Sequence, residues 1–122
     1  MIPNNRPYYK VITSSIIPRL LSLFISISAI TIGPFIFVRS PKVSDRLLRH
    51  ELVHVVQYKE LYYVGFVFLY VYFWLVGLWR HMDARMAYRE IPFEQEARHG
   101  ESHKDYVILR PKFAWCKFKI MK

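Results

Sequence analysis

The feature that most constrains the fold is a pair of histidines four residues apart, His50 and His54, inside an apolar run. Residues four apart lie on one face of an α-helix, one turn above the other, so both imidazoles can reach a common point. Glu51 lies about 100° further round the helix, beside that point. The His-Glu-x-x-His spacing therefore predicts a helix that binds a metal ion through two imidazoles, with a carboxylate at its side.

The residues around this motif predict one helix over about 44–60. Ser44 or Asp45 can cap its N-terminus. Gln57 extends the polar stripe of the two histidines by another turn, whereas most other positions are apolar. Such a helix is largely buried, with a narrow polar stripe facing another part of the chain.

A catalytic zinc site needs a third protein ligand, and the candidates are Glu94 and Glu96. Both lie in a short helix predicted over about 92–99, which begins with a proline and is followed by a glycine. The two carboxylates stand about 200° apart on that helix, so only one can face the metal. We favour Glu94, because Ala97 shares its face and is small enough for two helices to approach closely.

Glu96 stays the alternative ligand. If Glu94 binds the metal, we expect Glu96 to point to solvent or to pair with Arg89 or Arg98. The residues that could donate to a reacting oxyanion or support the ligands from behind are polar side chains of the same helices and their neighbours. They are Gln57, Tyr88, Arg98, His81, His99 and His103.

The chain before the motif is predicted to be irregular and then β structure. We expect residues 1–19, which hold three prolines, to be an irregular lead-in. Partial alternation rich in β-branched residues, broken by Gly33 and Pro34, predicts a β-hairpin over about 24–38. The alternative is one membrane span through residues 20–38, which are uncharged and long enough.

A second uncharged run, residues 61–79, is also long enough to cross a bilayer and is unusually aromatic. A metal site that joins His54 and Glu94 excludes a single crossing, because Glu94 would then lie about 30 Å away on the far side. We therefore expect the run to fold back at Gly65 or Gly77. It would form either a helical hairpin in the core or an aromatic face lying on a membrane surface.

Together these segments predict one α+β domain, mainly α, over residues 1–122. The hairpin lies beside the motif helix, the aromatic segment folds back, residues 81–90 form a short polar helix, and the third-ligand helix follows. The tail, residues 105–122, is expected to pack on the core through Phe113, Trp115 and Phe118.

The formal net charge of +9 favours an anionic partner. The basic residues are spread out and flank the run over 61–79, which is typical of the edges of a membrane-facing surface. We therefore expect peripheral contact with an anionic membrane and disfavour a nucleic-acid partner. Both a membrane-associated and a cytoplasmic location stay open.

His50-Glu51-x-x-His54 followed by Glu94-x-x-Ala97 resembles the gluzincin class of zinc metallopeptidases, in which a later Glu completes a two-His, one-Glu site. Residues 27–118 also resemble a group of small bacterial proteins with an HExxH motif, an aromatic middle and a Pro-Phe-Glu-x-Glu-Ala segment. The resemblance implies a minimal gluzincin-like domain, with zinc bound by the two histidines and Glu94, Glu51 as the general base, and a peptide or protein substrate.

One position departs from the gluzincin pattern. Peptidases of this class usually carry an acid four residues after the ligand Glu, where it orients a zinc-binding histidine, and here that position is Arg98. Such partners commonly change metal affinity by about tenfold to a hundredfold. Asp45, Asp83, Glu96 or a backbone carbonyl would have to replace it.

Two other functions are compatible with the sequence. One is a non-catalytic, membrane-associated protein with a degenerate or structural metal site, which a fourth protein ligand would favour. The other is a small integral membrane protein with spans at 20–38 and 61–79, in which the motif is accidental and Glu94 lies far from the histidines.

Overall fold

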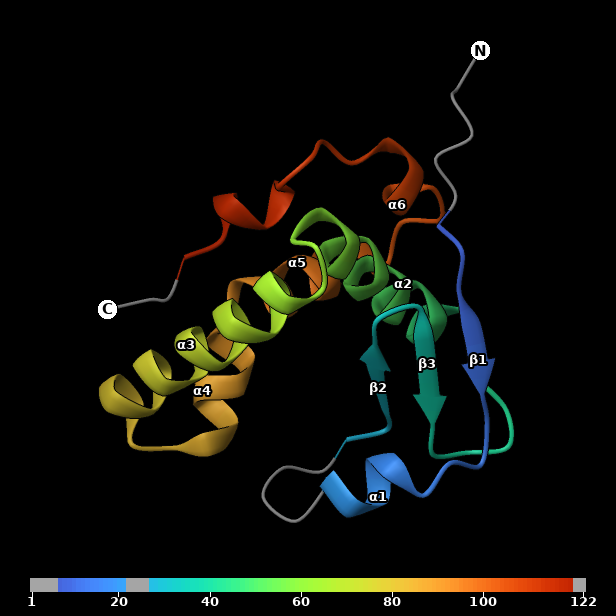
Figure 1. Ribbon diagram of the computed structural model, residues 1–122, viewed down its shortest axis with the longest axis horizontal. Helices are drawn as coiled ribbons and strands as arrows, with labels where there is room; N and C mark the ends of the chain where they lie inside the picture. The colour runs from blue at the N-terminus through green and yellow to red at the C-terminus, as the bar shows by residue number, and fades with distance from the viewer. Residues whose placement is uncertain (1–6, 22–26, 120–122) are drawn as a thin grey trace.

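The computed structural model describes residues 7–21 and 27–119. Within them the chain forms an α+β fold that is mainly helical, with a small sheet at one side and a long helical hairpin at the other (Figure 1). The strands are β1 (Lys10–Ile12), β2 (Ala29–Ile32) and β3 (Phe35–Val38). The helices are α1 (Ile17–Leu21), α2 (Asp45–Glu60), α3 (Val64–His81), α4 (Ala84–Glu90), α5 (Pro92–Gly100), α6 (Tyr106–Leu109) and the 3-10 helix η1 (Ala114–Lys117).

The sheet has the order β1-β3-β2, so β2 lies at an edge. The predicted hairpin is confirmed, because β2 and β3 pair antiparallel with Ile30 opposite Phe37. Gly33 makes the turn with a left-handed φ of 62°, a conformation that glycine adopts at no steric cost. The expected start of the hairpin, at 24, falls among residues 22–26, which lie outside the described residues. A membrane span through 20–38 is wrong, since the hairpin occupies half of it.

The expectation of an irregular lead-in over 1–19 is also wrong for its described part. β1 pairs in parallel with β3, placing Val11 opposite Ile36. The helix α1 follows directly. A three-residue strand carries little local signal, and its hydrogen bonds come from residues more than twenty positions away.

The helix α2 joins the two halves of the core. Ser44 caps it, accepting a hydrogen bond of 3.1 Å from the backbone N–H of Leu47. One face packs on the sheet, where Val55 meets Ile36 and Val38. The other side contributes Tyr58 to an aromatic cluster with α3 and α5. A helix buried on both sides has to satisfy its own polar side chains internally.

The aromatic run does not fold back on itself, so the expected helical hairpin within residues 61–79 is wrong. The chain turns before α3, at Tyr62 and Tyr63, which both have positive φ. From Val64 the helix α3 is continuous past Gly65 and Gly77, so the prediction of a bend at either glycine is wrong.

The reversal of the chain comes at the end of α3, where Met82 adopts a left-handed conformation. The helix α4 then returns along α3 (Figure 1). Gly77 lets the two backbones approach, since a Cβ there would lie 2.9 Å from the Cα of Ala87. This glycine therefore serves close helix packing rather than a bend.

The C-terminal elements close the aromatic cluster from the far side. The ring of Trp115 in η1 packs edge-on against Phe93, with centroids 4.9 Å apart, and against Phe73. This part of the expected tail packing is confirmed. Phe113 is 45% exposed, so its expected place in the core is wrong. Phe118 contacts the ring of His99 instead of the cluster.

Candidate metal centre

The helix α2 gathers three metal-binding side chains on one stretch of its surface. The ligand atoms of His50, Glu51 and His54 all lie within 4.8 Å of one another, and this cluster could hold a metal ion. Glu51 and His54 are buried, and His50 is nearly so. Three such groups, packed together away from water, need a counter-charge or a ligand between them.

The helix α5 brings Glu94 to the same point. One oxygen of Glu94 lies 3.2 Å from Nε2 of His50, and the other lies 3.1 Å from Nε2 of His54. Ligand atoms bound tetrahedrally at about 2.0–2.1 Å from a zinc ion lie about 3.3 Å apart. The separations therefore suit a shared ion. Proline at the start of α5 and its end at Gly100 agree with the bounds expected from the sequence.

The Nε2 atom of His54 is a buried nitrogen that lacks a hydrogen-bond partner among the described residues. The nearest acceptor is a Glu94 oxygen at 3.1 Å, and the two groups form an ion pair only when His54 is protonated. A buried polar atom without a partner is costly in a folded protein. A metal ion would satisfy this nitrogen and the Glu94 carboxylate together.

The opposite nitrogen of His54 is held from behind by Gln57. The Nδ1 atom lies 2.8 Å from the side-chain oxygen of Gln57, which can only accept, so Nδ1 carries the proton. The Gln57 amide cannot turn round, because its nitrogen donates to Glu96 and to the Phe93 carbonyl. This fixed tautomer leaves the lone pair of neutral His54 on Nε2, facing Glu94.

His50 has a different support, Glu101, which the sequence reasoning missed. The Nδ1 atom of His50 lies 3.4 Å from a Glu101 carboxylate oxygen. Arg49 holds the backbone of Glu101 through a hydrogen bond of 2.7 Å to its carbonyl. Glu101 therefore stands where a partner for the first histidine is needed, seven residues after Glu94 instead of four.

Arg98, at the position where the resemblance expects an acid, does not face the site. Its guanidinium donates to the carbonyl of Arg89. Of the acids considered as replacements, Asp83 caps α4. Glu96 supports His54 only through Gln57. The acid that contacts a histidine of the motif from behind is Glu101, which lies just beyond the last residue of α5.

Glu96 is the clearest correction to the predicted side-chain directions. We expected it in solvent or paired with Arg89 or Arg98, but it is fully buried. Arg110 donates to it at 2.6 Å, and Tyr106 at 2.8 Å. Burial disfavours its ionised form, yet Arg110 outweighs burial and lowers the pKa of Glu96.

The charges at the site are strongly coupled. Burial opposes protonation of His54, but the Glu94 and Glu51 carboxylates outweigh it and raise its pKa to about 9. Burial likewise opposes ionisation of Glu94, but the histidines hold its pKa well below the ordinary value. Burial raises the pKa of Glu51, against the opposing effect of His54 and His50. Without a metal, the cluster therefore binds a proton on His54 at neutral pH.

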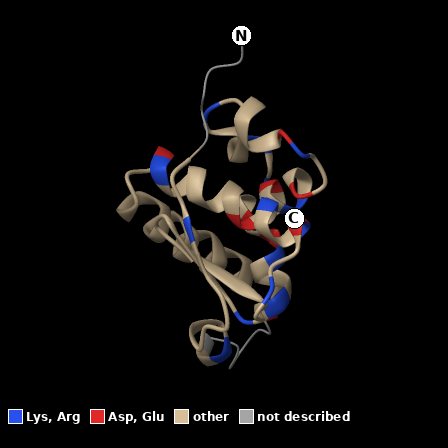
Figure 2. Ribbon diagram, turned by 90° about the vertical axis from the view of Figure 1, so that its right-hand side faces the viewer, with Lys and Arg blue, Asp and Glu red and all other residues tan. Residues whose placement is uncertain are grey.

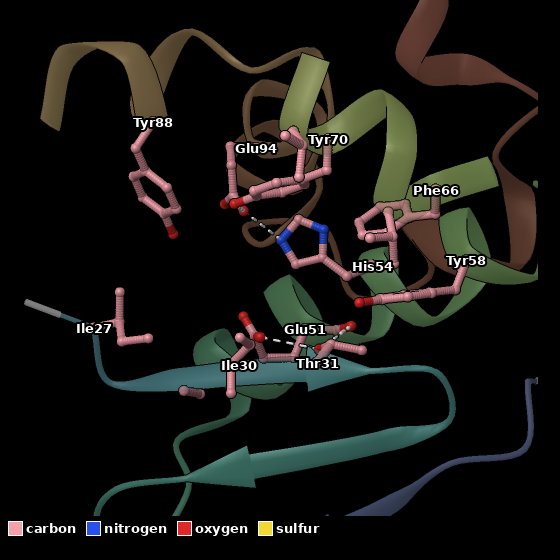
Figure 3. A pocket seen from close by; sticks show the side chains of 13 residues that line it. Ile27, Ile30, Thr31, Glu51, His54, Tyr58, Phe66, Tyr70, Tyr88 and Glu94 are labelled. Atoms are coloured by element: carbon pink, nitrogen blue, oxygen red, sulfur yellow. Dashed lines mark hydrogen bonds and ion pairs between the residues drawn. The ribbon is translucent and has the colours of Figure 1, made fainter. Parts of the chain in front are cut away.

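A pocket of about 180 Å³ lies over this cluster, between β2 on one side and α3 and α4 on the other (Figure 3). Glu51, His54 and Glu94 supply its charged groups, and apolar and hydroxyl-bearing side chains line the rest. Thr31 of β2 donates to a Glu51 oxygen at 3.0 Å and so fixes the direction of that carboxylate.

Two tyrosines also face the pocket. Tyr70 of α3 donates to Glu94 at 2.7 Å. Tyr88 of α4 points its hydroxyl into the open space (Figure 3). Burial first, and then the charge of Glu94, raise the pKa of both hydroxyls, so both stay protonated and can donate at neutral pH.

The other predicted donors lie elsewhere. Within the described residues, the pocket lining includes Tyr88 but not Arg98, His81, His99 or His103. The rings of His99 and His103 contact one another at the far end of α5, with centroids 5.4 Å apart and planes tilted by 58°. Gln57 acts from behind the site and does not line the pocket.

Sequence reasoning missed four residues that build the site: Thr31, Tyr70, Glu101 and Arg110. Each comes from another element than the motif helix, at a sequence distance that no helical period connects. Tyr70 had a weak signal as a hydroxyl inside an uncharged run, whereas Arg110 is one of several bases in the tail. In neither case does the sequence identify the carboxylate partner, which is Glu94 for Tyr70 and Glu96 for Arg110.

Comparisons with protein families, curated proteins and solved structures find no match for the chain.

Proposed function

We propose that this chain is a zinc-dependent hydrolase of the metallopeptidase type, with His50, His54 and Glu94 as the metal ligands. One observation carries the proposal. Both Nε2 atoms lie within 3.2 Å of the Glu94 carboxylate, while both Nδ1 atoms contact an acceptor on the opposite side. Imidazoles in metal sites are held in this manner, with the second nitrogen directed at a fixed partner.

The donor set suits zinc better than a harder cation. Two imidazoles and one carboxylate are ligands that zinc accepts in catalytic sites, whereas calcium and magnesium prefer oxygen alone. When bound, the ion lowers the pKa of a coordinated water to about 7 and polarises a carbonyl oxygen. That the domain is gluzincin-like is part of the same proposal.

Glu51 is the general base in this proposal. Its carboxylate takes a proton from the attacking water and passes it to the leaving amine. The hydrogen bond from Thr31 keeps one oxygen fixed, so the other is directed at the pocket. Burial raises the pKa of Glu51, which brings it nearer to neutral pH and makes the carboxylate a better proton acceptor.

Two further features support a peptide as the substrate. Tyr88 has a protonated hydroxyl in the pocket, which can donate to the oxygen of a carbonyl under attack. The strand β2 is an edge strand, and Ala29, Ile30 and Thr31 line the pocket beside Glu51. An extended peptide can pair with such an edge through its own backbone.

The test combines metal analysis with Glu51→Gln. We expect the purified protein to bind about one zinc per chain, and His54→Ala to lose it. Glu51→Gln should keep the zinc and lower the hydrolysis of a peptide library by about a hundredfold or more. Asp105→Asn, which changes an exposed acid far from the site, is the matched control and should leave both unchanged.

A second candidate is a closed, non-catalytic metal site with Glu51 as the fourth ligand. Its support is that Glu51 belongs to the cluster whose ligand atoms lie within 4.8 Å of one another. The same variant separates the two. If Glu51→Gln loses the zinc as well, Glu51 is a ligand and the hydrolase proposal fails.

A further inference from the structure

The outer side of α3 is an unbroken apolar surface. Seven of its side chains lie at positions that repeat every three or four residues, and each is about half exposed or more. We call them the apolar stripe: Val64, Val67, Phe68, Val71, Tyr72, Leu75 and Trp79. Only 11% of α3 is buried, and by length and composition alone it could span a membrane. Proteins in water rarely expose a continuous apolar surface of this size.

The packing of α3 argues against a crossing. The helix α4 lies along it, with Gly77 against Ala87 at a distance that leaves no room for a side chain. Arg85 and Arg89 of α4 are both exposed. If α3 crossed a bilayer, it would carry these charges into the hydrocarbon, where each costs several kcal/mol. One side of α3 is therefore exposed, whereas α4 covers the other side.

The two ends of the stripe have the residues expected at a lipid–water boundary. Trp79 and Tyr62 are 84% and 87% exposed, and aromatic rings of this kind prefer the headgroup level. Arg80 and Arg85 are exposed beside the Trp79 end. Lysines and arginines recur over the length of the molecule, whereas acidic residues gather near its middle (Figure 2).

We propose that the apolar stripe docks α3 flat on the surface of an anionic lipid bilayer. The apolar side chains enter the boundary between headgroups and acyl chains, and the arginines meet anionic headgroups. The net charge of +9 favours such a membrane and opposes the alternative of a second copy of the chain on the same face, because two copies repel one another.

The docked orientation also indicates a class of substrate, a step that rests on the proposed function. Val67 and Val71 belong both to the apolar stripe and to the pocket lining. The pocket over Glu51 therefore opens at the lipid surface. Its substrates are polypeptides held at the same membrane rather than free in solution.

Vesicle flotation of the full-length chain tests the docking. We expect binding to vesicles of equal parts phosphatidylcholine and phosphatidylglycerol, and much weaker binding to phosphatidylcholine alone. Phe68→Ser together with Leu75→Ser should weaken binding by about tenfold or more, since both side chains would be buried in lipid. Leu109→Ser is the matched control, because Leu109 is 63% exposed on α6. It should bind as wild type.

Three results would overturn the docking. The first is equal binding by the double variant and by wild type. The second is a wild-type dimer in sedimentation analysis that the double variant turns into monomer, since the stripe is then a protein interface. The third is resistance of the bound protein to extraction at alkaline pH, which indicates a spanning helix. Because the stripe is exposed, circular dichroism should find both variants folded.

A second measurement tests the substrate class separately. One peptide is offered free and, with a lipid anchor, on the same vesicles. Wild type should cleave the anchored form at least about tenfold faster, an advantage of effective concentration at the surface. The double variant should lose that advantage while keeping its rate on the free peptide. Vesicle binding by Glu51→Gln should be normal, so a failure of hydrolysis leaves the docking result standing.

Discussion

Two carboxylates on α5, Glu94 and Glu96, are both buried and stand on opposite sides of the same short helix. Glu96 meets Arg110, a permanent cation whose side chain is 2% exposed. Glu94 meets two histidines, whose charge depends on pH. The Glu96 side is thus a closed ion pair, whereas among the described residues no lysine or arginine pairs with Glu94.

This difference separates a structural ion pair from the proposed metal site. A buried carboxylate with a fixed guanidinium has no reason to bind anything else. A buried carboxylate between two imidazoles has its charge balanced only by protons or by a metal. The two sides are connected, since Glu96 holds Gln57 and Gln57 holds His54. The Glu96–Arg110 ion pair therefore helps to position His54 beside Glu94.

The largest effect is expected from breaking the closed side. Arg110→Met leaves Glu96 buried without its cation, along with the Glu60 carboxylate that Arg110 also contacts at 3.0 Å. Removing one partner of a buried pair typically costs about 3–5 kcal/mol of unfolding free energy. Urea denaturation, with and without zinc, measures the loss.

Arg46→Met is the matched control. Arg46 pairs with Glu101 at 3.3 Å, but its side chain is 68% exposed, and exposed pairs contribute about 0–1 kcal/mol. Adding Glu96→Gln to Arg110→Met should restore part of the loss, because the fully buried Glu96 charge is then no longer stranded. An Arg110→Met protein as stable as the Arg46→Met protein would mean that the two sides of α5 do not differ in this way.

More of the Glu94 site than of the Glu96–Arg110 ion pair could be predicted from the sequence. His50 and His54 are joined by a helical period, and Ala97 gave a local reason to turn Glu94 toward them. Arg110 lies fourteen residues after Glu96, across a turn and the helix α6, so no period relates the two. The polar stripe of α2 included Gln57, but nothing local shows that its amide connects a histidine to Glu96.

For the fold as well, features that depend on nearby residues were predicted, and features that depend on distant residues were missed. Proline, glycine and apolar periods located α2, α5 and the β2–β3 hairpin, because those signals act within a few residues. The strand β1 was missed because β3, far along the chain, supplies its partner. Glu101 was missed because it lies past the expected end of its helix, where side-chain direction depends on tertiary packing.

A smaller effect should come from the support of His50. Glu101→Gln removes the charge that faces Nδ1 of His50 and leaves the ligands in place. We expect zinc affinity to fall by about tenfold to a hundredfold, as for other such partners, with the stability of the metal-free protein little changed. Competition with a fluorescent zinc chelator measures the affinity.

Arg98→Gln is the control for Glu101→Gln, since Arg98 occupies the position where the resemblance expects an acid. Its side chain faces the Arg89 carbonyl and not the site, so zinc affinity should stay at the wild-type value. If Arg98→Gln changes affinity and Glu101→Gln does not, the support of His50 has been assigned to the wrong residue.

The effect that separates the two sides by sign is the dependence of stability on pH. In the metal-free protein the pKa of His54 is raised from 6.5 to about 9. This contribution to stability is complete below pH 6.5 and is lost as pH rises to about 9, at up to about 1.4 kcal/mol per pH unit. Glu96 has a lowered pKa, so its contribution is present above pH 4.5 and is lost as pH falls.

Zinc should remove the loss of stability at alkaline pH and leave the loss of stability at acid pH. The reason is that zinc replaces the proton of His54 and does not contact Glu96. Thermal unfolding between about pH 2 and pH 9, with and without zinc, gives both slopes. Glu94→Gln should flatten the alkaline slope of the metal-free protein, since the carboxylate that raises the pKa of His54 is gone. If the protein still loses stability at alkaline pH with zinc bound, the group that titrates is not His54 beside Glu94.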